Sequence, residues 1–294
     1  MNKYLFPIYR ILVPKPIRTA LLKKSLRKKI RNHFNSLSEE EVNEEQAEVL
    51  KNLETEEVNI FPYPFRTNYS PEKIEVKYDS EKGMSYVIQD GKRLYFKKRW
   101  GEKKIQKAYC DLMREQDINS PHRYLAGKFI AGRNDVLADI GAAEGNFSLY
   151  VIDDVSKIYI FEYDKEWIEA LRVTFGPWPG KVEIINKYLS DHDDKSHIRF
   201  DTFYKNHPDV NFLKIDVDGA ESVVLNSCKE PFSGNNSFKI ALCTYHKNED
   251  ERDFTKLLND YGFSITTSRG YMINYYDKKM KAPYLRRGLI RAIK

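Results

Sequence analysis

The chain has 294 residues, of which 41% are hydrophobic and 13% aromatic, so a folded core is expected and a disordered chain is excluded. No stretch reaches the roughly 18 apolar residues that a membrane span needs, and residues 1–13 lack the cleavage site of a signal peptide. The three cysteines are far apart and form no C-x-x-C pair. This spacing argues against a disulfide framework or a zinc site and favours reduced thiols in a cytoplasmic protein.

The net charge of +6 conceals a strong asymmetry along the chain. Residues 1–33 carry ten Lys or Arg, residues 278–294 carry seven, and neither segment contains an acidic residue. The middle of the chain, residues 34–277, contains the other 32 basic residues and all 43 acidic ones, so it is net acidic. Nucleic acid is usually bound by a basic face of a folded domain, so the acidic middle argues against a nucleic-acid partner. Basic ends with interleaved apolar residues suit an anionic membrane surface better.

Residues 14–34 are predicted to form a basic amphipathic helix. Lysines and arginines fill much of its surface, and apolar side chains recur every four residues on one side: Leu22, Leu26, Ile30 and Phe34. Two interpretations stay open. The helix either attaches to the inner face of a membrane as a peripheral contact, or packs on the domain with a solvated basic face.

Short elements are expected between this helix and residue 133. Ser38 followed by Glu41 resembles a capping box and begins an acidic, helical segment. The Asp90-Gly91 pair between strand-like runs predicts a β-hairpin. Three short strands and one helix are expected over residues 74–78, 85–89, 94–98 and 103–116.

From residue 134 strands and helices alternate, which predicts an α/β fold with a doubly wound, mostly parallel sheet covered on both faces. The last two strands, 263–267 and 271–275, are too close for a crossover helix, so the sheet should end in an antiparallel hairpin. The earlier strands are expected over residues 136–140, 157–162, 182–187, 211–216 and 238–244. The sequence therefore divides into four regions. Residues 1–57 form a basic then acidic helical segment, and residues 58–133 form a small β and helical accessory region. Residues 134–276 form the main α/β domain, and residues 277–294 form a basic tail.

The segment Asp139-Ile-Gly-Ala-Ala-Glu-Gly145 links a strand to a helix that begins near Asn146. Glycines there let a ligand approach the backbone, and ligands of such sheets bind at the carboxyl ends of the strands. The dinucleotide fingerprint G-x-G-x-x-G is incomplete, because its second glycine is missing. Two acids, Asp139 and Glu144, would repel a pyrophosphate but suit the cationic sulfonium and ammonium groups of S-adenosylmethionine.

Glu162 stands at the end of the second strand, 23 residues after Asp139. An acid at that strand end can accept hydrogen bonds from both ribose hydroxyls, a role that NAD enzymes share. Asp164 is well placed as the N-cap of the next helix. We therefore predict that Glu162 binds ribose and that Asp164 caps the helix.

Three acids follow a buried strand at the start of a helix: Asp216, Asp218 and Glu221. Asp216 is expected to belong to the site. For Asp218 and Glu221, a site role and a helix-capping role both stay open. Three carboxylates can also hold Mg²⁺ with waters, but no other hard-ligand spacing supports this, so we predict no metal ligands.

Taken together, three segments resemble the FkbM-type S-adenosylmethionine-dependent methyltransferases: Asp139-Ile-Gly-Ala-Ala-Glu-Gly-Asn-Phe-Ser148, Phe161-Glu162 and Lys214-Ile-Asp-Val-Asp-Gly-Ala-Glu221. The likeness covers about residues 134–276. It implies a Rossmann-like class I methyltransferase fold, S-adenosylmethionine as the donor, and methyl transfer to oxygen. It also implies a small-molecule or glycan acceptor, often a sugar hydroxyl in polysaccharide biosynthesis. The predicted cofactor-binding residues are Asp139, Gly141, Ala143, Glu144, Gly145, Asn146, Glu162 and Tyr163.

A hydroxyl acceptor must lose its proton as its oxygen attacks the methyl group. Asp216 and His246, which follow neighbouring strands, are the predicted catalytic residues, and a surface-loop histidine is the alternative for His246. His122 is interpreted as a loop histidine, with a place beside the acceptor as the alternative. Three rival functions stay open: an NAD-dependent oxidoreductase, a non-catalytic membrane-associated scaffold, and an RNA methyltransferase, which the acidic middle disfavours.

Overall fold

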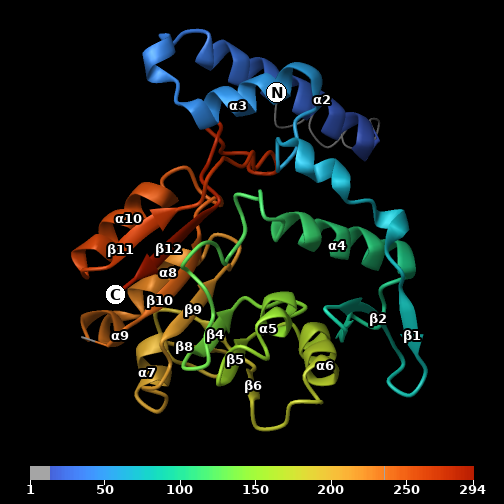
Figure 1. Ribbon diagram of the computed structural model, residues 1–294, viewed down its shortest axis with the longest axis vertical. Coiled ribbons are helices and arrows are strands. Elements are labelled where there is room, and N and C mark those ends of the chain that lie inside the picture. The colour runs from blue at the N-terminus through green and yellow to red at the C-terminus, as the bar shows by residue number, and fades with distance from the viewer. Residues whose placement is uncertain (1–13, 235) are drawn as a thin grey trace.

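A seven-stranded sheet forms the centre of the computed structural model, which describes residues 14–234 and 236–294 (Figure 1). Its strands are β4 (Val136–Ile140), β5 (Lys157–Phe161), β6 (Val182–Ile185), β9 (Phe212–Ile215), β10 (Lys239–Cys243), β11 (Ser264–Thr267) and β12 (Leu289–Ile293). They lie in the order β11-β12-β10-β9-β4-β5-β6. Every pair from β10 to β6 is parallel, and β12 is antiparallel to both of its neighbours. The predicted Rossmann-like, mostly parallel sheet with an antiparallel end is therefore confirmed.

The second strand of the antiparallel end differs from the prediction. Residues 271–275 form no strand, and the partner of β11 is β12, within the segment predicted as a basic tail. Arg291 of β12 is buried and donates to the carbonyl oxygens of Tyr124 and Arg123. The apolar run at 271–275 is buried against the N-terminal helices instead. Apolar content alone does not distinguish a strand of the sheet from a buried segment without strand pairing.

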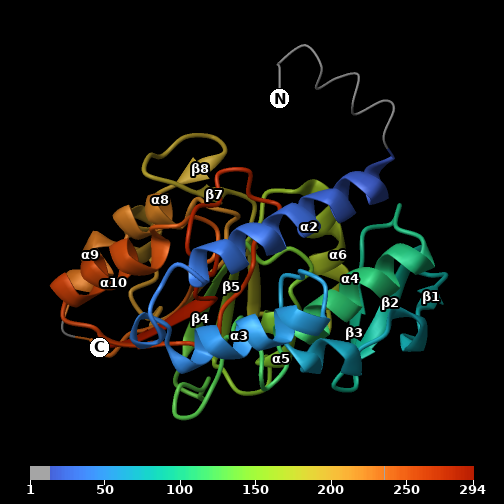
Figure 2. The same ribbon diagram turned by 90° about the horizontal axis from the view of Figure 1, so that it is seen from above.

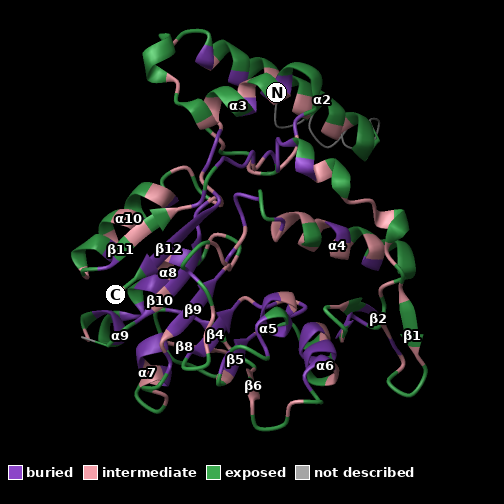
Figure 3. Cartoon of the chain, in the orientation of Figure 1, coloured by how far each residue is buried: buried purple, intermediate pink, exposed green. Residues whose placement is uncertain are grey.

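Helices cover both faces of the sheet and create two separate cores. Side chains alternate along each strand, so Leu137 belongs to one core and its neighbour Ala138 to the other. One face is covered by α5 (Asn146–Tyr150) and α6 (Lys165–Thr174). The other is covered by α7 (Phe200–Tyr204), α8 (Glu221–Asn226), α9 (Lys229–Ser233) and α10 (Asp250–Asp260). Buried residues accordingly follow the sheet in Figure 3.

The accessory region adds a small antiparallel sheet to the first core. It contains β1 (Lys77–Asp79), β2 (Met84–Gln89), β3 (Lys92–Tyr95) and α4 (Glu102–Glu115), preceded by the 3₁₀ turns η2 (Pro64–Asn68) and η3 (Pro71–Lys73). Asp90 and Gly91 both have positive φ, 47° and 77°, between the paired β2 and β3. The predicted hairpin is thus confirmed, because the favoured two-residue turn requires φ above zero at both positions. Another short pair lies beside the main sheet: β7 (Tyr188–Leu189) and β8 (His197–Ile198).

At the N-terminus, α2 (Lys15–Phe34) and α3 (Glu44–Thr55) lie side by side, joined through the 3₁₀ turn η1 (Glu39–Glu41) (Figure 2). Glu41 accepts a hydrogen bond from the backbone N–H of Ser38, as the capping-box prediction requires. The second half of α2 packs against α3 and residues 271–275 through Leu26, Ile30 and Phe34.

The first half of α2 remains exposed. Ile17, Leu21 and Leu22 are 52%, 51% and 48% exposed, so Leu22 does not continue the buried stripe that its spacing predicts. Among the described residues no helix has the length and apolar character that a membrane crossing requires. The sequence prediction about residues 1–13 lies outside the described residues.

Candidate active site

The predicted site residues converge at the carboxyl ends of β4, β5, β9 and β10. A solvent-open cavity of about 970 Å³ lies there between the glycine loop after β4 and the end of β5. Five predicted residues line it: Gly141, Ala143, Glu162, Tyr163 and Asp216. Parallel strands present their carboxyl ends at one edge of a sheet, so this is where such folds bind ligands.

Backbone packing explains both glycines of the loop. Gly141 has φ of 75°, and a Cβ atom there would lie 2.1 Å from the carbonyl oxygen of Asp216. Gly145 has φ of 79° at the N-cap of α5, where a Cβ would lie 2.7 Å from Leu171. The loop therefore needs glycine for close approach to β9 and α6 as well as for its left-handed conformation.

Asp139 stabilises the glycine loop and does not line the cavity. It is fully buried, lies 3.0 Å from Nζ of Lys214 and accepts a 2.7 Å hydrogen bond from Ser148. Lys214 in turn donates to the carbonyl oxygen of Gly141 at 2.8 Å. The buried pair thus holds the glycine loop, and the charge of Asp139 is already balanced.

Glu144 and Asn146 also lie outside the cavity lining. Glu144 is buried, and burial raises the pKa of its carboxyl to about 8. Its side chain is therefore largely neutral near pH 7, in contrast to the negative charge expected from the sequence. The carbonyl oxygen of Asn146 accepts from the side chain of Gln89, and its own side chain accepts from Phe147.

Glu162 faces the cavity from the end of β5. Its Oε2 accepts a 3.0 Å hydrogen bond from the backbone N–H of Ala143. Its Oε1 accepts from the N–H groups of Tyr163 and Asp164 at 2.8 and 2.7 Å. Asp164 accepts from the first-turn N–H groups of α6, so the predicted N-cap is confirmed. These bonds fix the Glu162 carboxylate, and Oε2, which accepts only one of them, keeps capacity for a further donor.

Aromatic rings form the outer wall of the cavity beside Glu162. Tyr163 and Tyr188 are stacked, with centroids 4.2 Å apart and an interplanar angle of 28°. Trp167 of α6 also lines the cavity. Such a wall offers flat apolar surface with polar edges, which suits a planar heterocycle.

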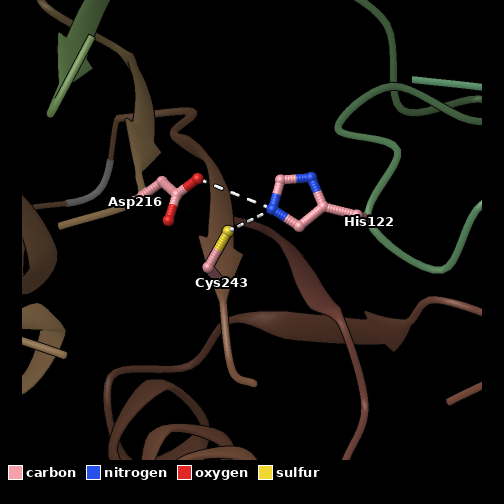
Figure 4. Close-up of side chains that lie close together, drawn as sticks. All are labelled: His122, Asp216 and Cys243. Atoms are coloured by element: carbon pink, nitrogen blue, oxygen red, sulfur yellow. Dashed lines mark hydrogen bonds and ion pairs between the residues drawn. The ribbon is translucent and has the colours of Figure 1, made fainter. Parts of the chain in front are cut away.

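Asp216 is fixed from behind by the loop that precedes the main domain. Its Oδ2 accepts a 2.9 Å hydrogen bond from the hydroxyl of Tyr124 and lies 3.5 Å from Nε2 of His122 (Figure 4). His122 Nε2 is also 3.5 Å from Sγ of Cys243. Burial alone would raise the pKa of Asp216, but the adjacent His122 and Lys214 outweigh it and hold that pKa well below its usual range. Asp216 is therefore a fixed anion.

His246 lies among three carboxylates and is not a surface-loop histidine, because its side chain is only 10% exposed. Nδ1 is 2.9 Å from Oε1 of Glu221, and Nε2 is 3.8 Å from Oδ1 of Asp216 and 3.7 Å from Oδ1 of Asp218. Burial lowers the pKa of His246, but Asp218 and Glu221 outweigh it and raise the pKa to about 10. His246 therefore carries its proton at neutral pH and cannot accept another in this state.

A second opening, a groove of about 1,880 Å³, lies on the other side of Asp218. It is lined by His246, Lys247, Tyr276 and Lys279, and Asp218 lines both hollows. The junction of the two hollows is thus formed by the acids after β9 and the histidine after β10. A donor in the cavity and an acceptor in the groove would meet at this junction.

Sequence reasoning missed several residues of this site. His122 does lie in a loop, as expected, but it is buried against Asp216. Tyr124, Tyr188 and the groove segment 274–281 were not singled out. Each reaches the site through long-range packing, and no local spacing marks them. The strand ends, in contrast, are marked by their own motifs.

The sheet and the glycine loop define a Rossmann-like fold of the class I methyltransferase kind. Residues 185–265 match the model of the methyltransferase FkbM domain, which confirms on that segment the resemblance expected from the sequence. The match supports an S-adenosylmethionine-dependent methyltransferase in general. No curated protein sequence matches the chain.

Solved structures that are similar to the chain include three methyltransferases. The methyltransferase FkbM from Methylobacillus flagellatus is 12% identical with a TM-score of 0.44, over 66% of this chain and 53% of that one. A SAM-dependent methyltransferase from Aquifex aeolicus is 14% identical with a TM-score of 0.40, over 66% and 99% of the two chains. A precorrin-6y C5,15-methyltransferase from Geobacter metallireducens is 14% identical with a TM-score of 0.37, over 55% and 78%. The chain thus spans about half the length of the Methylobacillus protein.

Proposed function

We propose that the protein is an S-adenosylmethionine-dependent O-methyltransferase that acts on a hydroxyl group of a small molecule or a sugar of a polysaccharide precursor. The observation that carries this proposal is the cavity between the glycine loop and Glu162, which shares its lining residue Asp218 with a separate groove. One hollow is available for a donor and the other for an acceptor. The FkbM domain match supports the donor, and the acceptor class comes from the family resemblance.

The residues of the cavity fit the donor. Oε2 of Glu162 can accept a hydrogen bond from a ribose hydroxyl, and the stacked Tyr163 and Tyr188 offer a surface for adenine. Asp216 supplies a fixed negative charge at the inner end, where a sulfonium cation would be stabilised. When bound, S-adenosylmethionine would supply an electrophilic methyl group for the acceptor oxygen, with the electrons of the broken carbon–sulfur bond remaining on sulfur and the hydroxyl proton released to water.

Asp216 and His246 are assigned to holding the acceptor hydroxyl at the junction. Asp216 is a fixed anion and His246 holds its proton, so neither is a strong base in this state. Asp216 would instead accept a hydrogen bond from the acceptor hydroxyl and His246 would donate one to its oxygen, which keeps that oxygen in line with the methyl group. Such positioning accounts for much of the rate enhancement in a displacement of this kind.

Calorimetric titration tests the proposal. The wild-type protein is expected to bind S-adenosylhomocysteine in the micromolar range and its 2′-deoxyadenosyl analogue more weakly. Glu162→Ala should weaken binding by about 10- to 100-fold, since a charge-assisted hydrogen bond is lost, and should abolish the preference for the ribose. Glu169→Ala, on the exposed face of α6, is the matched control. A folded wild-type protein that binds neither compound removes the proposal, and binding of NADH instead favours the oxidoreductase.

For α2 we propose peripheral contact with an anionic membrane at the cytoplasmic face. The exposed Ile17, Leu21 and Leu22 stand among lysines and arginines, and residues 15–34 contain no acid. Apolar side chains surrounded by basic ones suit insertion between anionic headgroups. The buried second half of the helix would fix this surface to the domain.

Vesicle flotation tests this contact without deleting the buried half of α2. Wild-type protein should float with phosphatidylserine vesicles at low salt, and replacing the three exposed apolar residues of α2 by serine should reduce flotation at least tenfold. Ile88→Ser, which alters an exposed apolar residue of β2, is the control. Equal flotation of all three proteins contradicts the proposal.

A further inference from the structure

A further hollow, of about 1,190 Å³, lies between the 3₁₀ turn η2, the loop 118–126 and the segment 268–270 that follows β11. It shares no lining residue with the cavity or the groove. Among the described residues that line it, three are arginines, Arg123, Arg269 and Arg291, and one is an acid, Glu48. We call this hollow the arginine pocket. It is rich in positive charge and separate from the proposed active site.

Arg291 is the most enclosed of the three arginines. It is 8% exposed, and its Nε and Nη2 atoms donate to the carbonyl oxygens of Tyr124 and Arg123. Its Nη1 atom has no hydrogen-bond partner among the described residues. Burial, together with the charge of Arg123, lowers the pKa of Arg291 to about 10, so this side chain is still a cation at neutral pH. A buried cation is costly unless an anion lies beside it.

Arg123 supplies a second guanidinium group in a fixed position. Its Nε and Nη1 atoms donate to the carbonyl oxygens of Leu125 and Gln116, both at 2.8 Å. Its Nη2 atom has no hydrogen-bond partner within the part of the chain that the structure describes. Carbonyl oxygens hold a guanidinium group in place but carry no formal charge. The two positive charges therefore remain, and the lowered pKa of Arg291 shows that they interact.

The chain does not supply the missing negative charge. Neither Arg123 nor Arg291 forms an ion pair with a described residue, since their printed partners are all backbone oxygens. Residues 1–13 and Asn235, which lie outside the described part, contain no acid. Glu48 lies 3.7 Å from Arg269, whose side chain is 83% exposed, so this acid belongs to the outer edge of the pocket. A counter-charge for the two inner arginines must come from a bound anion.

Two buried hydroxyl groups add further donors to the lining. Ser120 and Ser268 accept from the backbone N–H groups of His122 and Leu289, at 3.2 and 3.1 Å. Because each hydroxyl oxygen already accepts, its hydrogen is available to a ligand, and neither hydroxyl donates to a described residue. Donors without acceptors are thus gathered around one hollow.

The opposite wall of the arginine pocket is aromatic. The rings of Tyr63 and Phe65 line it and are stacked, with centroids 6.1 Å apart and an interplanar angle of 14°. Such a wall suits an apolar or ring-shaped part of a ligand. The hollow is also much larger than an inorganic anion. The lining therefore fits an anionic group that is attached to an organic body.

We propose that the arginine pocket binds the phosphate group of a phosphorylated organic molecule, with Arg123 and Arg291 as its ionic partners and Ser120 and Ser268 as hydroxyl donors. A guanidinium group matches phosphate because its planar fork donates two parallel hydrogen bonds to two oxygens. The organic part of the ligand lies against Tyr63 and Phe65. This site does not depend on the proposed methyl transfer, because no residue of the pocket lines the cavity or the groove.

Calorimetric titration of the full chain with phenyl phosphate, at constant ionic strength, tests the inference. The wild-type protein should bind phenyl phosphate saturably, in the millimolar range or tighter, and should not bind its uncharged analogue benzyl alcohol. Arg123→Gln and Arg291→Gln should each weaken binding at least tenfold, since charge-assisted hydrogen bonds are lost. Arg252→Gln, which removes an exposed arginine of α10, is the matched control and should bind as the wild type does.

Thermal unfolding of each variant separates lost binding from lost folding. Arg291→Gln leaves two carbonyl oxygens without their donor, so Arg123→Gln, at a half-buried position, decides the test if the first variant does not fold. Phenyl phosphate should raise the unfolding temperature of the wild type and of Arg252→Gln but not that of Arg123→Gln. A folded wild-type protein that does not bind phenyl phosphate overturns the inference, as does equal weakening by Arg252→Gln.

Dihexanoyl phosphatidic acid, used as a dissolved monomer, identifies the source of the phosphate. If it binds at least tenfold more tightly than phenyl phosphate, and Arg123→Gln removes that difference, the phosphate belongs to a lipid headgroup. Equal or weaker binding, again sensitive to Arg123→Gln, assigns the pocket to a water-soluble phosphorylated compound. Binding of both compounds that Arg123→Gln leaves unchanged contradicts the site. The triple serine variant of α2 should bind both as the wild type does, which separates this pocket from the proposed membrane contact.

Discussion

The two hollows of the site are built in different ways. The cavity is lined largely by the ends of β4, β5 and β9, each followed at once by its functional residues. The groove collects Ile60, residues 245–249 and residues 274–281, which are far apart in the sequence. The proposed donor side is thus a local property of strand ends, whereas the proposed acceptor side depends on how distant segments pack.

The packing that forms the groove comes from the N-terminal helices. Residues 271–275 are buried against Leu26, Ile30 and Phe34 of α2, and Ile273 donates its backbone N–H to Ile60. Arg287 forms an ion pair with Glu45 of α3. The groove should therefore be sensitive to changes that leave the cavity untouched, and the following substitutions test that separation.

The largest effect is expected for Gly141→Ala in the cavity. The new methyl group would meet the carbonyl oxygen of Asp216, and a left-handed φ adds strain, so the loop must move. We expect loss of detectable cofactor binding in calorimetry, with a stability loss of a few kcal/mol. Gly180→Ala also has positive φ but open space around it, so it should bind cofactor normally. Normal binding by Gly141→Ala would contradict the assigned role of the loop.

Ile30→Ala should act on the groove alone. Ile30 is fully buried in the third core, and truncating such a side chain costs about 2–5 kcal/mol. Hydrogen exchange in residues 271–287 should become faster, while cofactor affinity stays within twofold of the wild type. Leu22→Ala, on the exposed half of the same helix, should change neither. Weakened cofactor binding in Ile30→Ala would show that the two hollows are coupled.

The pH dependence of stability tests the buried acid of the glycine loop. Burial raises the pKa of Glu144 to about 8 in the folded state, above its ordinary value of 4.5. The folded state therefore holds this proton more tightly, and its contribution to stability is lost as pH rises from about 4.5 to 8. Relative to wild type, Glu144→Gln should gain about 1 kcal/mol or more in urea unfolding between pH 5 and pH 8. If the difference in unfolding free energy between Glu144→Gln and the wild type were the same at pH 5 and pH 8, the Glu144 carboxylate would be exposed to water and not buried.

Tyr188→Ala should have the smallest effect, confined to the cavity. Removing the ring that stacks on Tyr163 takes away part of the aromatic wall, and such contacts are worth about 0.5–1.5 kcal/mol. Affinity for S-adenosylhomocysteine should fall by about 2- to 10-fold, without a change in hydrogen exchange of residues 271–287. Tyr78→Ala, at an exposed position of β1, is the control. An unchanged affinity would place the adenine elsewhere.

Much of the fold could be predicted because its signals are local. The alternation of apolar runs and helices marked the five parallel strands of the main sheet but not β7 and β8. The hairpin at Asp90-Gly91 and the N-cap at Asp164 followed from turn and cap chemistry. The error over residues 271–275 arose because an apolar run shows burial but not its partner. β12 was not predicted because its arginine and nearby basic residues suggested a tail, yet the buried Arg291 donates its hydrogen bonds to backbone carbonyls inside the fold.

By itself the sequence determined the sheet, the glycine loop and the acids at the strand ends, because periodicity and short motifs act between neighbouring residues. The tertiary structure alone decided that Asp139 is paired with Lys214, that Glu144 is held neutral, and that His122 and Tyr124 fix Asp216. These outcomes depend on burial and on charges brought together from distant parts of the chain. The electrostatic character of a site is set by those surroundings, and no spacing along the sequence encodes them.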